Sequence, residues 1–229
     1  MTLPAGRLPN ASDPVVSVVV PARNESDYLP RTLTSLAAQE TDVPFEVIVV
    51  DGDSDDGTPG IAIEWGARLV RGPGDGIGAG RHRGAKVARG SWLAFVDADT
   101  VLDPAYLETM LGTVEWRELA AASSRCRIPG LRAKPMELTI NHIFPRLDRP
   151  ILPGFNFFVD TDVYEETGGF PNVANEDTAY SRQLGERYRT GYGRRVLVET
   201  SPRRIEAQGL LGMCVHYLRL DWQRLRSGY

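Results

Sequence analysis

The sequence predicts an α/β domain with a mostly parallel central sheet flanked by helices. In the first half of the chain, short runs rich in β-branched residues alternate with segments of helical periodicity. Two of these runs end almost identically, in VVDGDS at 49–54 and in FVDADT at 95–100. Buried parallel strands read as continuous apolar runs, and their helical crossovers are right-handed. Because such sheets bind ligands at the carboxyl ends of their strands, the paired carboxylates predict a ligand site at that edge.

Length and composition are those of one globular domain. The chain has 229 residues, of which 42% are hydrophobic and 24% are charged, and its formal net charge is −4. No basic excess is present to neutralise phosphates, which argues against nucleic acid as the partner. Residues 1–14 are small or polar and include proline, so we expect a flexible tail there, followed by a single domain over 15–229.

Cysteine usage and the absence of targeting patterns bear on the cellular setting. Cys126 and Cys214 lie far apart and match no metal-ligand spacing. The first 14 residues carry no signal-peptide pattern, and we find no apolar run of about 18 residues. These features favour a reduced cytoplasmic setting and predict no membrane-spanning segment.

The elements of the first half follow from the apolar runs and the turn residues between them. The first strand is expected to be broken at 21–25, and Asp27 can cap a helix that carries Pro30 in its first turn. The segment 72–80 is too rich in glycine to be helical throughout. Strands are expected at 15–20, 45–50, 68–71 and 91–96, and helices after Asp27 and at 59–66, 81–89 and 105–116.

The second half alternates less regularly, which predicts a mixed arrangement. Asp160-Thr161-Asp162 is expected to begin a turn and to cap a short helix that starts at Val163. Strands are expected at 120–127, 155–159 and 196–199, and helices at 135–144, 163–167, 177–187 and 210–225. We see neither a repeat nor a linker that would divide the chain.

The Asp-x-Asp pattern is a weak signal by itself, since it begins at Asp51, Asp53, Asp97 and Asp160. Context separates these instances. The pairs at Asp51 and Asp97 end buried strands, where uncompensated carboxylates are costly and a cation or a hydrogen-bonding ligand would relieve that cost. Turn formation alone is an alternative explanation for the acids of 51–56, and a weaker one for Asp97 and Asp99.

Three segments together resemble family 2 glycosyltransferases, which have the GT-A fold. PARNE at 21–25 with VDGDSDDGT at 50–58 is similar to the start of that family, and GSWLAFVDAD at 90–99 resembles its metal-binding strand. GGF at 168–170 with the following Glu176-Asp177 resembles its acceptor-side segment and catalytic acids. The resemblance implies a GT-A domain with a Rossmann-like nucleotide half at 15–117 and an acceptor and catalytic half at 118–229.

The resemblance also implies roles for individual residues. Asp177 would be the general base, while Asp97 and Asp99 would hold Mg²⁺ or Mn²⁺ against the donor diphosphate, Asp99 being the more direct ligand. Asp51 and Asp53 would lie near the base and ribose; the order Asp-Gly-Asp departs from that of many members and leaves open which of them contacts the base. The residues expected to bind the nucleotide sugar are Pro21, Ala22, Arg23, Glu25, Asp51, Asp53, Arg81, Asp97 and Ala98.

Elementary chemistry agrees with these implied roles. A metal and arginines can stabilise a leaving diphosphate, and one carboxylate can accept the proton of an attacking hydroxyl. With one base and no positioned nucleophile, we expect single displacement with inversion at the anomeric carbon. Arg81 follows flexible glycines and is expected to reach the diphosphate; the alternative is a solvated basic helix face that also carries Arg83 and Lys86.

Several further assignments stay open at the level of sequence. Arg203 and Arg204 follow the last expected strand, where they either clamp the diphosphate or form a surface turn. His216 is a candidate third metal ligand, with a packed or exposed helix histidine as the alternative. The helix expected at 210–225 either docks on the domain or lies on a lipid surface near a polyprenyl-linked acceptor, which would place the protein at the inner face of the membrane.

Two other functions compete with glycosyl transfer to a glycan or lipid-linked hydroxyl. A sugar-phosphate nucleotidyltransferase shares the nucleotide-binding plan, but should carry a glycine-rich loop with arginine and lysine directly after the first strand, where this chain has PARNE. A non-catalytic nucleotide-sugar-binding protein would not need Asp97, Asp99 and Asp177 together.

Overall fold

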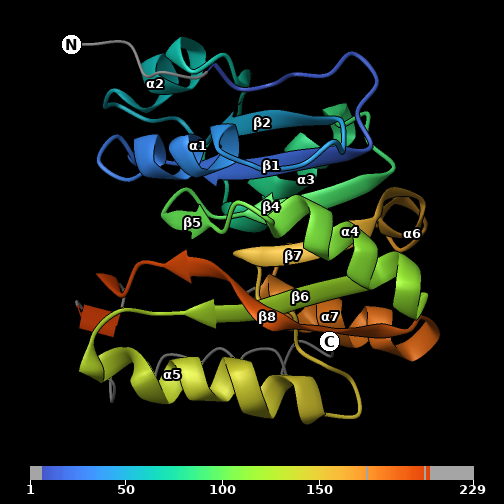
Figure 1. The fold of residues 1–229 in the computed structure, drawn as a ribbon. Helices are drawn as coiled ribbons and strands as arrows, with labels where there is room; N and C mark the ends of the chain where they lie inside the picture. The colour runs from blue at the N-terminus through green and yellow to red at the C-terminus, as the bar shows by residue number, and fades with distance from the viewer. Residues whose placement is uncertain (1–6, 174, 204, 207–229) are drawn as a thin grey trace.

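The computed structural model describes residues 7–173, 175–203 and 205–206. They form one eight-stranded sheet with the strand order β3-β2-β1-β4-β7-β6-β8-β5, and helices cover it (Figure 1). The strands are β1 Val16–Ala22, β2 Phe45–Asp51, β3 Arg68–Arg71, β4 Trp92–Val96, β5 Thr100–Leu102, β6 Ala121–Arg127, β7 Asn156–Asp160 and β8 Thr190–Thr200. The helices are α1 Leu29–Ala37, α2 Thr58–Glu64, α3 Ile77–Val87, α4 Tyr106–Arg117, α5 Lys134–Leu138, α6 Thr161–Glu166 and α7 Glu176–Arg187.

The first half of the sheet is parallel, as the sequence predicts. β1 pairs in parallel with both β2 and β4, and β2 pairs in parallel with β3. Ala22 lies opposite Asp51 in this register, and Val19 lies opposite Phe95. The three strands β1, β2 and β4 therefore end at the same edge, and the loops that follow them meet there.

The second half is mixed, also as expected. β7 runs antiparallel to β4 and to β6, while β6 and β8 are parallel. The short strand β5 was not predicted, because its three residues directly follow the acid pair Asp97 and Asp99. It pairs antiparallel with the end of β8, with Thr100 opposite Thr200. This pairing brings the chain after β8 back to the acid pair.

Element boundaries differ from expectation where local signals compete with packing. Pro21 and Ala22 extend β1 instead of ending it, and α1 is preceded by Tyr28 rather than capped by Asp27. Instead of the single helix expected at 135–144, the α-helix α5 ends at Leu138 and is followed by a short π-helix over Thr139–Ile143. The tripeptide at 160–162 caps α6 as predicted, through Asp160, which accepts a hydrogen bond from the Val163 amide at 3.0 Å; the helix itself begins earlier than expected, at Thr161.

The part of the expected tail that the structure describes is packed on the domain. Leu8 is buried, and its amide donates to the Trp65 carbonyl at 3.1 Å. The Asn10 side chain accepts a hydrogen bond from the Val47 amide at 3.0 Å, at the outer side of β2. Residues 7–14 are therefore not loose, because Leu8 gains a buried apolar position. In the part of the chain that the structure describes, no helix is both long and apolar enough to cross a bilayer.

Two apolar clusters lie on the opposite faces of the sheet. One joins β1 and β2 to α1 and α4, and the other joins β1, β2 and β4 to α3, α6 and α7. The second cluster depends on a close approach of α3 to the sheet at Gly84. A Cβ atom at this position would overlap a methyl group of Val19 and lie 3.0 Å from one of Val50.

We expect Gly84→Ala to lower the free energy of unfolding by about 1–3 kcal/mol, because overpacking would push α3 away from β1. Gly112→Ala, in α4, is the matched control. A Cβ there meets no atom within 4 Å, so the change should raise stability by up to about 1 kcal/mol through helix propensity. Urea unfolding of both variants measures the difference, and equal effects would contradict the close approach of α3.

Candidate active site

The candidate site lies at the carboxyl edge of β1, β2 and β4. Three loops meet there, and the beginning of α7 and the chain after β8 join them from the second half. The loops after β1 and β2 are bonded to each other. The Asn24 amide donates to Ser54 Oγ at 2.9 Å, and the Glu25 amide donates to Thr58 Oγ1 at 2.8 Å. Asn24 has φ 55°, a left-handed conformation that asparagine tolerates.

Asp56 accepts hydrogen bonds from both of these loops. Its carboxylate accepts from the Ser26 amide at 3.1 Å and from the Thr58 amide at 2.9 Å. Partial burial works in the opposite direction, but the hydrogen bonds from Thr58 and Ser26 lower the pKa of Asp56 from 3.8 to about 2. Asp56 thus holds the loop at 23–26, which carries Arg23 and Glu25, against the loop after β2.

The structure distinguishes Asp51 from Asp53. Asp51 ends β2 with only 4% of its surface exposed, and its Oδ1 has no hydrogen-bond partner among the described residues. Asp53 is exposed and has φ 65° in the turn that follows. A buried carboxylate oxygen without a donor is costly, so Asp51 is the acid whose position fits a hydrogen-bonding ligand.

The other residues expected at the nucleotide pocket divide into supports and exposed groups. Pro21, Ala22 and Ala98 are buried. The Ala98 carbonyl accepts a hydrogen bond from Thr32 Oγ1 at 2.7 Å, which ties the acid-pair loop to α1. Arg23 is exposed, and its Nη1 reaches the Gly74 carbonyl only at 3.5 Å.

Arg81 joins the two halves of the site. Its side chain is 3% exposed; Nη2 lies 2.8 Å from Asp97 Oδ1, and Nη1 lies 2.5 Å from Glu176 Oε1. The guanidinium carbon lies 5.2 Å from the centre of the Phe170 ring. In this structure the guanidinium therefore acts as an internal ion-pair partner instead of projecting into solvent from a basic helix face.

Glu176 and Asp177 begin α7 beside this arginine. Burial raises the pKa of the Glu176 carboxyl, an effect that Arg81 opposes and Asp177 reinforces. Asp177 Oδ2 accepts a hydrogen bond from the Gly154 amide at 2.9 Å, and Oδ1 accepts one from the Thr178 amide at 2.7 Å. Two backbone donors therefore fix the orientation of Asp177.

Asp99 lies at the rim of the site and is paired with Arg203. Arg203 Nε is 2.9 Å from Asp99 Oδ2, and Nη1 donates to Glu25 Oε2 at 2.7 Å. The same guanidinium lies over the Tyr28 ring, 4.6 Å from its centre. Of the two arginines singled out after the last strand, Arg203 thus belongs to the site; Arg204, His216 and the helix expected at 210–225 lie outside the described residues.

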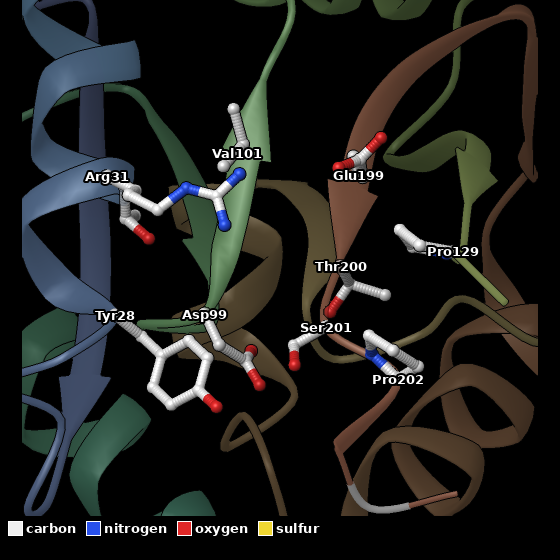
Figure 2. A pocket seen from close by; sticks show the side chains of 10 residues that line it. Tyr28, Arg31, Asp99, Val101, Pro129, Glu199, Thr200, Ser201 and Pro202 are labelled. Atoms are coloured by element: carbon white, nitrogen blue, oxygen red, sulfur yellow. The ribbon is translucent and has the colours of Figure 1, made fainter. Parts of the chain in front are cut away.

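A small pocket of about 80 Å³ opens beside Asp99. Figure 2 shows the Asp99 carboxylate between Tyr28, from the segment before α1, and Ser201 with Pro202, from the chain after β8. Arg31 and Thr32 of α1 also line this pocket. Asp99 therefore lines this pocket, whereas Asp97 is paired with the buried Arg81.

The carboxylates fit a hard divalent cation that arrives with a diphosphate. Asp97 and Asp99 supply oxygen ligands one residue apart, and Mg²⁺ is commonly held by one or two carboxylates together with substrate phosphates. Within residues 7–173, 175–203 and 205–206, no three His, Cys, Asp or Glu side chains form a metal-binding group. The set that is present therefore suits a cation shared with a ligand.

Sequence reasoning overlooked two contributors to the site. Gly154, which orients Asp177, lies so close to Arg81 that a Cβ atom would be 2.6 Å from the guanidinium carbon. Tyr28 stacks on Arg203 from the segment before α1. Neither residue belongs to a recognisable pattern, because both act through contacts between segments far apart in the chain.

Comparisons with known proteins identify the family. The sequence model of Glycosyl transferase family 2 matches residues 17–170. The putative glycosyltransferase EpsH of Bacillus subtilis is 36% identical over 105 residues, which cover 44% of this chain and 30% of EpsH. The chain thus spans less than a third of that relative. Because the family model matches well over half of the chain, the protein belongs to the family 2 glycosyltransferases.

Solved structures confirm the predicted GT-A fold. S. aureus TarS in complex with UDP superposes with a TM-score of 0.71 at 20% identity, covering 81% of this chain and 60% of that one. Mannosyltransferase PcManGT of Pyrobaculum calidifontis, solved with GDP-Man and Mn²⁺, has a TM-score of 0.69 at 22% identity, covering 93% of this chain and 67% of that one. At this level of identity the similarity establishes the fold alone.

The low pKa of Asp56 predicts a pH-dependent contribution to stability. Because the pKa is lower in the folded than in the unfolded state, the carboxylate stabilises the fold fully above about pH 4, and this contribution is lost as the pH falls towards 2. The difference in unfolding free energy between wild type and Asp56→Asn should therefore be largest above about pH 4 and shrink below it.

Urea unfolding at several pH values measures this difference, and Asp55→Asn is the control. The neighbouring Asp55 is exposed, so its variant should stay within about 0.5 kcal/mol of the wild type throughout. An Asp56→Asn effect that is the same at every pH would show that the carboxylate charge does not hold the two loops.

Proposed function

We propose that the protein is a metal-dependent, inverting glycosyltransferase that moves a sugar from a nucleotide diphosphate sugar to a hydroxyl acceptor. One observation carries the proposal: Arg81 joins Asp97, at the end of the acid-pair strand, to Glu176, whose neighbour Asp177 is oriented by the Gly154 amide. Groups suited to a diphosphate and a group suited to a hydroxyl proton thus converge at one edge of the sheet.

The nucleoside is proposed to lie between the loops after β1 and β2. Asp51 Oδ1, buried and without a donor among the described residues, would accept a hydrogen bond from the base or the ribose. Asp53, exposed in the next turn, would lie at the outer side of the same pocket, and Arg23 and Glu25 would border it. The complexes of TarS with UDP and of PcManGT with GDP-Man support a nucleotide diphosphate as the ligand class.

The metal is proposed to be Mg²⁺ or Mn²⁺, held by Asp97 and Asp99. When bound, it would neutralise charge that develops on the leaving diphosphate. PcManGT was solved with Mn²⁺, which supports this choice. Arg81 would fix the Asp97 carboxylate, since its guanidinium already bonds one oxygen of that side chain.

Asp177 is proposed as the general base. Its carboxylate would take the proton of the acceptor hydroxyl while the hydroxyl oxygen forms a bond to the anomeric carbon and the bond from that carbon to the diphosphate oxygen breaks. This single displacement inverts the anomeric configuration. The acceptor is proposed to be a hydroxyl of a glycan or of a polyprenyl-linked carrier, the latter at the inner face of the membrane.

A thermal-shift panel of nucleoside diphosphates, with and without Mn²⁺, tests the donor and the metal together. At a ligand concentration of about 100 times Kd, binding stabilises the fold by about 2.7 kcal/mol, which raises Tm by about 5–10 °C for a chain of this size. We expect one nucleotide to give this shift only with Mn²⁺, and Asp99→Ala to abolish it.

Asp162→Ala is the matched control for this panel. Asp162 is an exposed acid of another Asp-x-Asp pair, at the start of α6, and its variant should keep the metal-dependent shift. A shift that does not require the metal, or one that Asp99→Ala retains, would remove metal dependence from the proposal. Binding without donor turnover would favour a nucleotide-sugar-binding protein instead.

We expect Asp177→Asn to lose transfer about 10²- to 10⁴-fold while it keeps donor affinity within about threefold. The amide oxygen can still accept a hydrogen bond from one of the two backbone amides that orient Asp177, but it cannot take the acceptor proton. Release of nucleoside diphosphate measures transfer, and calorimetry measures donor binding. Glu186→Gln removes an exposed carboxylate from the same helix and should leave both unchanged; wild-type transfer by Asp177→Asn would remove Asp177 from the mechanism.

A further inference from the structure

Two arginines contact the acids that follow β4, and they are held very differently. The Arg81 side chain is 3% exposed and lies inside the second apolar cluster beside Phe170, whereas the Arg203 side chain is 30% exposed. Arg81 comes from the middle of α3, but Arg203 comes from the chain beyond the end of β8. Arg203 can therefore leave its carboxylate partners for solvent without opening the core.

The Arg203 guanidinium is shared between two acids from separate loops. Its Nε lies 2.9 Å from Asp99 Oδ2, and its two terminal nitrogens bond both carboxylate oxygens of Glu25, one of them at 2.7 Å. The fork geometry of a guanidinium suits this two-oxygen contact to Glu25, as a lysine would not. One cation thus connects the acid proposed to hold the metal to the loop proposed to border the nucleotide.

Strand pairing brings Arg203 to this position. Thr100 lies opposite Thr200 in the antiparallel pair of β5 and β8, and the Thr100 hydroxyl donates to the Thr200 hydroxyl at 3.1 Å. Asp99 directly precedes this pair, and Arg203 follows it by three residues. The contact between them is therefore fixed by the sheet and is not the chance meeting of two surface side chains.

We propose that Arg203 is a placeholder cation that competes with the divalent metal for Asp99. In the donor-free protein its guanidinium neutralises the carboxylate. A divalent cation on the same carboxylate would repel the guanidinium, and Arg203, unlike the buried Arg81, is exposed enough to withdraw into solvent. Its departure also removes the partner of Glu25 at the edge of the nucleotide pocket. This inference rests on the proposed function, since it takes Asp99 as a metal ligand.

The energetics are compatible with displacement. The Arg203 side chain is 30% exposed and can be solvated when the pair separates, whereas the Asp99 side chain is only 9% exposed and needs another cation in its place. A divalent cation accompanied by a diphosphate offers Asp99 a stronger partner than one guanidinium does. The placeholder therefore weakens binding of the metal alone and delays it until the donor is present.

Binding of Mn²⁺ without nucleotide, followed by the electron paramagnetic resonance signal of the free ion, tests the proposal. We expect Arg203→Gln to bind Mn²⁺ roughly two- to fivefold more tightly than the wild type. Arg203→Lys, which keeps the charge but not the fork, should lie between them. Arg195→Gln is the matched control, since it removes an exposed arginine of β8 that faces Asp103 at 3.7 Å instead of the site, and it should match the wild type.

Circular dichroism and thermal melting establish that each variant is folded. Unchanged or weaker Mn²⁺ binding by folded Arg203→Gln, with Mn²⁺ binding by the wild type intact, would overturn the placeholder role and leave the proposed function in place. Failure of all the proteins to bind Mn²⁺, with UDP or GDP as well as without, would overturn both the placeholder role and the metal dependence.

Discussion

The buried guanidinium of Arg81 is the constraint on which the candidate site depends. Its two carboxylate partners come from the end of β4 and the start of α7, and its own helix lies against the sheet at Gly84. A buried charge that loses a partner costs several kcal/mol, so the three segments are held in one relative position. Arg81 thereby fixes Asp97 directly and holds the start of α7, which carries Asp177, through the neighbouring Glu176.

Most of the fold could be predicted from the sequence because its signals are local. Continuous apolar runs predict the strands β1, β2 and β4, and an apolar stripe at helical spacing predicts α1. The motif PARNE, together with the acid pairs, indicates the family. Strand β5 could not be predicted, since it depends on pairing with β8, far away in the chain. The packing of Leu8 could not be predicted either, since it depends on the Trp65 carbonyl and on the first apolar cluster.

The site was predicted less completely than the fold, for a related reason. Residue types and strand ends indicated Asp51, Asp97 and Asp99, but the sequence did not specify what each side chain contacts. Arg81 was expected near a diphosphate, which stays a prediction; the sequence did not show that it lies between two protein carboxylates, which its burial requires. Asp51 and Asp53 are only two residues apart, and burial alone separates them.

The antiparallel pairing of β4 with β7 has a consequence for how the two substrates meet. Five residue pairs, from Trp92 opposite Asp160 to Val96 opposite Asn156, form the seam between the parallel half and the mixed half. The loops proposed to bind the nucleotide belong to one side of this seam, and α7, which packs on β7 through Tyr180 and Phe157, belongs to the other. Because Arg81 bonds Asp97 on one side of the seam and Glu176 on the other, a change of twist along the seam would strain these ion pairs and alter the distance between the two proposed half-sites.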